Sequence, residues 1–410
     1  MSWISTKEQI SIFSFVLCFI HVNCAPQYPV ILVPGDGGSQ LVAKLNKTSV
    51  PHYWCTKQTV GYESIWINLE ELVPTVIDCF VDNMRLVYDA KTRKTSNSPG
   101  VDIRTVDFGN TTPVEWLDPS KTSHYFPFLS YFYPIVNDLV SIGYIRGVSV
   151  RGAPFDFRKA PNELDDYYND MKNLVEDTYK KNNNSKVVIV AHSMGNPVSL
   201  YFLNHQPKAW KDQYIQSLVS LAGVWGGAVK PLRLMSSGDS LGVIIVSPSH
   251  VRPEQRSMPS TAFLMPSEKF WKPSEVLVMT PKKNYTVVDY KEFFADLNFT
   301  DGYEMRKDTE NLIGDLTPPE VTVHCLHGSG VETPDMLIFG EGEFPDVYPK
   351  VKPGDGDGTV NLRSLLGCLS WQGNQKEPVY HQVIDKAEHM AILQDEAVRK
   401  YIMDVVTGKR

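Results

Sequence analysis

The stretch VVIVAHSMGNPVS, residues 187–199, decides the fold of this chain. Its first four residues are all β-branched, which predicts a buried strand, and apolar residues at helical spacing follow it. Ser193 stands between the strand and the helix. A sharp strand–Ser–helix turn needs small residues two before and two after the serine, and Ala191 and Gly195 stand there. The pattern therefore predicts a nucleophile elbow with Ser193 as the nucleophile, rather than a chance match in a loop.

Strands and helices alternate on both sides of this elbow. Apolar runs predict strands at 28–33, 148–150, 187–190, 218–221, 321–326 and 379–384, and helical periodicity appears at 128–142, at 163–181 and from His389 onward. This alternation predicts an α/β fold with a largely parallel sheet. With the elbow, it predicts an α/β-hydrolase fold that carries an inserted cap and lid.

The glycine-rich loop after the first predicted strand, PGDGGS at 34–39, is the candidate oxyanion loop. In α/β-hydrolases one oxyanion N–H comes from such a loop and the other from the residue after the nucleophile. Asp36 and Met194 are therefore the expected pair. An ordinary turn is the alternative.

The catalytic acid is expected in GDGDGTVN, residues 354–361, where Asp357 is preferred to Asp355. Chain order in this fold is serine, then acid, then histidine. A calcium-binding loop is the rival interpretation, but Thr359 and Leu366 stand where its template requires Asp or Asn and Glu.

His389 is the expected general base, because it follows the last predicted strand and begins the final helix. Chain order excludes the four histidines that precede the nucleophile. His381 lies inside a predicted strand, where a structural role is expected.

Composition limits the partners. The 410 residues carry a net charge of −7 without a basic run, so nucleic acid is not expected. Residues 10–22 are almost all apolar but too short to span a bilayer. We expect residues 1–24 to be a secretory signal peptide and residues 25–410 the catalytic domain, with an uncleaved anchor as the alternative.

Four cysteines remain after such a signal peptide, and they can pair in three ways. Nearest-neighbour pairing, Cys55–Cys79 and Cys325–Cys368, is the expected one. Metal binding around residues 324–327 is not favoured, because neighbouring side chains of a strand face opposite ways. Five glycosylation sequons, at Asn46, Asn110, Asn183, Asn284 and Asn298, fit an exported glycoprotein.

Three segments surround the predicted core. Residues 45–85 carry Trp54 and Trp66 in a disulfide-clipped subdomain, whose aromatic side chains either rest on a lipid surface or pack inward. The apolar, glycine-punctuated segment 222–247 predicts a lid loop, and about 248–320 a cap insertion.

Several motifs together resemble the lecithin:cholesterol acyltransferase family, and within it most closely the lysosomal (group XV) phospholipase A2 branch. The matching stretches are VILVPGDGGSQL (30–41), SVRGAPFDFR (149–158), VVIVAHSMGNPVSLYFL (187–203), GGAVKPLRLMSSGD (226–239), GDGDGTVNLRSLLGC (354–368) and EHMAIL (388–393). The resemblance implies the triad Ser193, Asp357 and His389, the oxyanion N–H groups of Asp36 and Met194, both disulfides, and membrane contact near Trp54 and Trp66. Residues 36–39 and 328–352 look divergent, so acyl-chain preference is not carried over.

The implied function is a calcium-independent phospholipase A and transacylase that needs no metal or cofactor. It would act at a phospholipid membrane surface and pass the acyl group to water or to a lipid alcohol such as ceramide. The implied location is the lysosomal lumen, with secretion as a second destination. A sterol acyltransferase and an inactive lipid-binding glycoprotein are the alternatives, and the oligomeric state stays open.

Overall fold

The computed structural model describes residues 28–66, 68, 76–120, 129–240 and 246–410. The expected signal peptide, residues 1–24, lies outside these ranges. Among the described helices, none has both the length and the apolar character needed to cross a bilayer.

A parallel sheet of six strands forms the centre of the molecule, in the order β15-β12-β9-β8-β1-β7. Its strands are β1 (Val30–Val33), β7 (Val150–Gly152), β8 (Val187–His192), β9 (Ile215–Leu221), β12 (Thr322–Ser329) and β15 (Val379–Asp385). Every residue of β1 and β8 is buried, as expected of continuous apolar strands covered on both faces of a parallel sheet. The predicted α/β fold with a parallel sheet is confirmed.

Helices cover this sheet. They are α3 (Tyr133–Ser141), α4 (Asp165–Lys181), α5 (Gly195–Asn204), α6 (Lys208–Tyr214) and α13 (Glu396–Val406). Helix α4 is amphipathic and buries Met171, Leu174 and Val175, while its outer face is charged. Helix α13 packs against α3, and α4 packs against α6 and β8.

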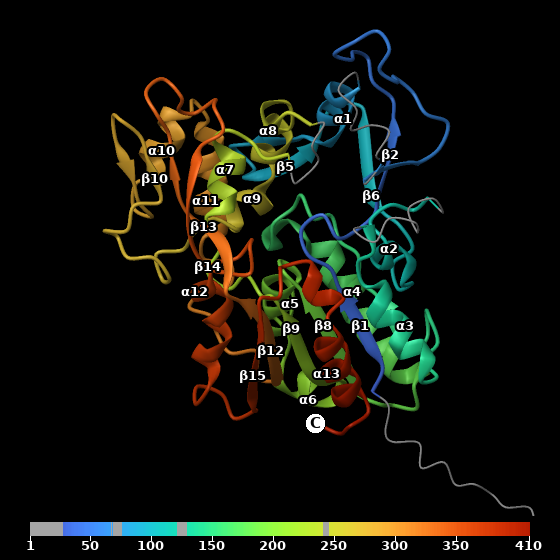
Figure 1. Cartoon of the computed structure of the whole chain (residues 1–410). Coiled ribbons are helices and arrows are strands. Elements are labelled where there is room, and N and C mark those ends of the chain that lie inside the picture. Colours follow the sequence, from blue (N-terminus) through green and yellow to red (C-terminus); the bar gives the residue numbers. More distant parts are fainter. Residues whose placement is uncertain (1–27, 67, 69–75, 121–128, 241–245) are drawn as a thin grey trace, which may run out of the picture.

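A second lobe stands beyond the carboxyl ends of the central strands (Figure 1). It contains α7 (Lys230–Met235), α8 (Pro248–Ser257), α9 (Pro259–Phe263), α10 (Tyr290–Asp296), α11 (Thr300–Thr309), β10 (Val278–Met279), β11 (Asn284–Tyr285), β13 (Val331–Ile338) and β14 (Lys350–Gly356). The lobe has its own apolar core, which includes Trp271, Phe293 and Phe294. The sequence predicted an insertion over 248–320, but the four-stranded sheet of this lobe also takes in β13 and β14.

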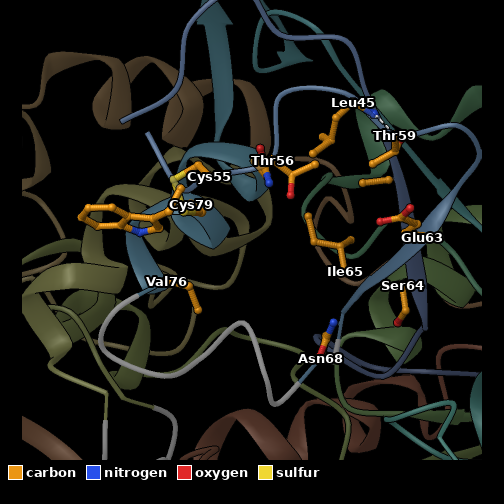
Figure 2. Close-up of a pocket in the computed structure, with 13 residues that line it drawn as sticks. Leu45, Cys55, Thr56, Thr59, Glu63, Ser64, Ile65, Asn68, Val76 and Cys79 are labelled. Carbon is orange, nitrogen blue, oxygen red and sulfur yellow. Dashed lines mark hydrogen bonds between the residues drawn. A yellow bond between two sulfur atoms is a disulfide. The ribbon is translucent and has the colours of Figure 1, made fainter. Parts of the chain in front are cut away.

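A smaller subdomain lies on the same side of the molecule (Figure 1). It contains β2 (Leu41–Leu45), β3 (Glu63–Trp66), β4 (Leu86–Asp89), β5 (Lys94–Asn97), β6 (Val101–Thr105), α1 (Ile77–Met84) and α2 (Thr112–Glu115). Figure 2 shows the Cys55–Cys79 disulfide on one side of a cavity of about 250 Å³, with Leu45 and Ile65 on the other. The sequence between 81 and 125 shows no clear period because these strands are short and partly exposed.

Short helices complete the described chain: α12 (Leu362–Leu365) and 3₁₀ turns at Pro161–Glu163, Leu366–Trp371 and Ala391–Leu393. The nearest-neighbour disulfide pairing is confirmed, with Cα–Cα distances of 5.5 Å for Cys55–Cys79 and 6.6 Å for Cys325–Cys368. The second disulfide joins β12 of the central sheet to the 3₁₀ turn at Leu366–Trp371.

Removing the second disulfide should destabilise the protein strongly. It closes a loop with a sequence separation of 43, for which the chain-entropy model gives about 4 kcal/mol. We expect the double variant C325A/C368A to unfold at a clearly lower guanidinium concentration than the wild type.

The control is C55A/C79A, which opens the shorter loop, with a separation of 24, in the peripheral subdomain. It should lower the midpoint less. Equal midpoints for the wild type and C325A/C368A would contradict the assignment of this disulfide to the stability of the central sheet.

Candidate active site

The predicted elbow is present at the carboxyl end of β8. Ser193 has a φ of +53°, a left-handed backbone conformation that is unusual for a residue other than glycine. Its N–H donates to the carbonyl oxygen of Leu221 on the neighbouring strand (3.0 Å). A Cβ atom on Gly195 would lie 2.4 Å from the carbonyl oxygen of Pro34, so only glycine fits there. The need for a small residue two positions after the serine, which identified the elbow in the sequence, is therefore met by Gly195.

Ser193, His389 and Asp357 form a continuous hydrogen-bonded line. The Nε2 atom of His389 is 2.8 Å from the Oγ of Ser193, and its Nδ1 is 2.7 Å from the Oδ2 of Asp357. All three residues are buried. The expected triad residues, far apart in the sequence, are thus brought together in the geometry that general-base activation of a serine requires.

Asp357 is held by the turn that follows β14. Its Oδ1 accepts hydrogen bonds from the N–H groups of Val360 (2.7 Å) and Thr359 (3.0 Å). Burial raises the pKa of Asp357, but His389 and these two N–H groups lower it more, so the net shift is downward. Asp355, the other candidate acid, instead accepts from the N–H of Gly330.

The position of His389 differs from the sequence-based expectation. It lies in a turn that precedes a 3₁₀ turn, and α13 begins only at Glu396. Asp395 caps that helix by accepting from the N–H of Val398. The N–H of His389 donates to the carbonyl oxygen of Asp357 (2.8 Å), which adds a backbone link between base and acid.

The glycine-rich loop after β1 passes directly beside the serine. A Cβ on Gly35 would lie 2.7 Å from the Cβ of Ser193. The indole Nε1–H of Trp66 donates to the carbonyl oxygen of Gly37 (2.7 Å), and the Trp66 ring lies under that glycine. Within the described part of the chain, no hydrogen bond occupies the N–H of Asp36 or Met194.

Two side chains that the sequence did not single out also contact this loop. The hydroxyl of Tyr131 accepts from the N–H of Gly35 (2.8 Å) and lies 2.6 Å from the Nδ1 of His192. The Nε2 of His192 lies 2.9 Å from the carbonyl oxygen of His389. Chain order correctly excluded His192 as the base, and no local pattern marks Tyr131, because its partners are distant in sequence.

The two tryptophans of the small subdomain have different surroundings. Trp54 is 50% exposed and stacks on His52, beside Tyr53, which is 91% exposed. Trp66 instead packs near Phe157 of the interior and donates its hydrogen bond to the glycine-rich loop after β1. All five sequon asparagines are exposed.

The segment predicted as a lid, residues 222–247, is described except for 241–245. Its described part up to Asp239 is almost entirely buried, and it includes α7. Lys230, at the start of α7, is the cation whose charge lowers the pKa of Asp36.

Asp36 carries an unusual charge environment. The residue is exposed at the surface, yet the protein packed around its carboxyl desolvates that group and raises its pKa to about 6, against the opposing effects of Lys230 and the Gly37 N–H. The folded state therefore binds a proton more tightly than the unfolded state, where the pKa is near 3.8.

This shift predicts a pH-dependent stability. Since the folded-state pKa is raised, the contribution of Asp36 to stability should fall as the pH rises from about 4 to about 6. In D36N this loss should be absent, so its melting temperature should exceed that of the wild type at pH 7.5 and match it near pH 3.5. Thermal melting across this range measures the difference, and a gap that does not change with pH would contradict the assignment.

Comparisons with known proteins agree with this geometry. The family model described as lecithin:cholesterol acyltransferase matches residues 62–396. The lysosomal phospholipase A and acyltransferase of Homo sapiens is 48% identical, over 93% of this chain and 90% of that protein, and its Canis lupus familiaris counterpart is 47% identical, over 93% and 91%. The phosphatidylcholine-sterol acyltransferase of Homo sapiens is 38% identical, over 93% and 85%.

A solved structure, the crystal structure of the Tle4-Tli4 complex, contains a chain that shares the fold, with a TM-score of 0.52 and 12% identity over 93% of this chain and 98% of that chain. The parallel sheet and the elbow make the fold that of an α/β-hydrolase. With a family match over most of its length, this chain belongs to the lecithin:cholesterol acyltransferase family.

Proposed function

We propose that this protein is a calcium-independent phospholipase A and transacylase, with Ser193, His389 and Asp357 as its catalytic triad. The observation that carries the proposal is the hydrogen-bonded line from the Oγ of Ser193 through His389 to Asp357. The relatives named lysosomal phospholipase A and acyltransferase, at 47 and 48% identity, support the substrate class.

In the first step the Oγ of Ser193 attacks the carbonyl carbon of a phospholipid ester, and the Nε2 of His389 takes the serine proton. Asp357 keeps the Nδ1–H of His389 in place and stabilises the imidazolium. The oxyanion accepts from the N–H groups of Asp36 and Met194. His389 then gives its proton to the leaving oxygen, and lysophospholipid departs.

The second step determines the product. Water that attacks the acyl-Ser193 ester yields a free fatty acid, whereas the hydroxyl of a lipid alcohol such as ceramide yields an acylated lipid. The triad is buried, and a site that excludes water favours the alcohol. Neither step needs a metal ion, because backbone N–H groups meet the oxyanion charge.

Membrane contact is assigned to the exposed aromatic tip of the small subdomain, Tyr53 and Trp54. Nearby Val60 is fully exposed. Amphipathic aromatic rings favour the lipid–water interface. Trp66 supports the oxyanion loop, and its contribution to the membrane surface is indirect.

The lysosomal lumen is the proposed location, with secretion as a second destination. The names of the relatives, the two disulfides and the five exposed sequons support an exported glycoprotein. We assign the second lobe, whose four-stranded sheet includes β13 and β14, the role of a cap over the bound acyl chains.

A sterol acyltransferase is the second candidate function, because phosphatidylcholine-sterol acyltransferases are also relatives, at 38% identity for the human protein. The two functions differ in the acceptor alcohol. An assay that offers ceramide and cholesterol in parallel vesicles distinguishes them by the product that forms.

Replacing the nucleophile tests the proposal directly. In S193A the attacking oxygen is absent, so release of fatty acid and formation of acylceramide should fall by about 10⁴-fold or more. Both products are measured with calcium chelated, on phospholipid vesicles that contain ceramide. S199A is the control, since Ser199 lies on α5 away from the triad. Undiminished turnover by S193A would exclude the proposed mechanism.

The two tryptophans should give different defects. The variant Y53A/W54A should lose about tenfold in activity on vesicles, because interfacial aromatic area is lost, and should keep its activity on a soluble short-chain ester. W66F should lose activity on both substrates. The carbonyl oxygen of Gly37 loses its hydrogen-bond donor, so the oxyanion loop is no longer held in position. Vesicle sedimentation and soluble-ester assays separate these outcomes. Full soluble-ester activity in W66F would refute its role in the loop.

A further inference from the structure

We propose that Tyr131 and His192 are positioning residues, which join the oxyanion loop to the loop of the general base through one directed chain of hydrogen bonds. The inference rests on the proposed function, since it concerns the same catalytic site. It assigns a role to two residues that touch neither the substrate nor the proton that is transferred.

The chain of hydrogen bonds has four members. It begins at the N–H of Gly35, passes through the hydroxyl of Tyr131 and the ring of His192, and ends at the carbonyl oxygen of His389. The three heavy-atom distances are 2.8, 2.6 and 2.9 Å. Tyr131 and His192 are each 1% exposed, so water does not compete for these bonds.

The direction of every bond is determined by its two ends. The carbonyl oxygen of His389 can only accept, so the Nε2 of His192 carries a hydrogen. Burial lowers the pKa of His192 to about 3, with a further lowering by His389, so the ring is neutral and its Nδ1 is an acceptor. The Tyr131 hydroxyl must then donate to Nδ1, which leaves its oxygen free to accept from the N–H of Gly35.

The ring of Tyr131 supports the oxyanion loop at a second point. A Cβ on Gly38 would lie 2.8 Å from its Cε1 and 2.9 Å from its Cζ, so the backbone of Gly38 lies directly against the ring. Gly35 and Gly38 flank the turn that contains Asp36. The hydroxyl and the ring of Tyr131 therefore fix both sides of the peptide that would present the Asp36 N–H to the oxyanion.

His192 performs the equivalent task for the base. It directly precedes Ser193, so its position is fixed by β8, and its hydrogen bond fixes the backbone of His389 relative to the nucleophile. It does not act as a second general base, because both of its ring nitrogens are already engaged and His389 occupies the Oγ of Ser193. An apolar residue of equal size at either position would leave the buried Gly35 N–H or the Tyr131 hydroxyl without its partner.

Three single variants separate the bonds. Y131F keeps the ring and removes the hydroxyl. The side-chain amide nitrogen of glutamine overlays Nε2 of a histidine, so H192Q keeps the bond to the His389 carbonyl and loses the acceptor for Tyr131. The side-chain oxygen of asparagine overlays Nδ1, so H192N keeps the acceptor and loses the bond to His389.

We expect Y131F to lower kcat on a soluble ester by about ten- to a hundredfold, because the Asp36 N–H is displaced, and to leave KM within about twofold. H192Q and H192N should each lower kcat. Since Y131F and H192Q break the same bond, Y131F/H192Q should lose little more kcat than Y131F alone. Y131F/H192N should lose clearly more, because H192N also breaks the bond to the carbonyl oxygen of His389.

The control is Y144F. Tyr144 is also a buried tyrosine, and its hydroxyl donates to the carbonyl oxygen of Tyr28, away from the triad. It should keep wild-type kcat. Melting temperatures establish that each variant is folded, and H192N and H192Q carry the test if Y131F does not fold.

The outcomes distinguish this inference from the proposed function. If S193A is as active as the wild type, the proposed function is wrong. If S193A is inactive but Y131F and both His192 variants keep wild-type kcat, the positioning role alone is overturned. It is also overturned if these variants raise KM with kcat unchanged, or if Y131F/H192Q multiplies the two single losses.

Discussion

The close approach of two backbone segments at Gly195 underlies the whole site. Because this residue has no side chain, the start of α5 can lie directly against the loop after β1: a Cβ on Gly195 would be only 2.4 Å from the carbonyl oxygen of Pro34. That contact forces Ser193 into its left-handed conformation, and the sheet holds it there through the Ser193 N–H bond to Leu221. The same contact brings the oxyanion loop beside the nucleophile. The nucleophile and the loop proposed to carry an oxyanion donor are thus placed by one steric constraint.

Local chemistry explains why much of the site could be predicted from the sequence. The elbow, the acid on its glycine-rich turn and the base after the last strand each depend on a few neighbouring residues with special backbone requirements. Asp357 illustrates this, since its partners Thr359 and Val360 are two and three positions away. The disulfide pairing followed from sequence proximity, but the family resemblance supported it as well.

Other features could not be predicted, because they depend on contacts between distant segments. Trp66 is of a residue type that favours membrane interfaces, yet its hydrogen bond to Gly37 joins it to the glycine-rich loop after β1. Tyr131 contacts a loop 96 residues away. The short strands β4 to β6 carry little periodicity. Strand β13 joins the second lobe by pairing with β10 and by burying Leu337 in its core, and β14 pairs with β13. The start of α13 was misplaced because its cap, Asp395, lies six residues beyond His389.

The two ends of the described chain are joined at the base of the molecule. The N–H of Tyr28 donates to the carbonyl oxygen of Val406, and the hydroxyl of Tyr144 bonds to the carbonyl oxygen of Tyr28. The bond between His389 and Ser193 likewise spans 196 positions. A ribosome must therefore release the chain through His389 before the triad can assemble. Turnover therefore reports that the segment carrying His389 has docked beside the nucleophile.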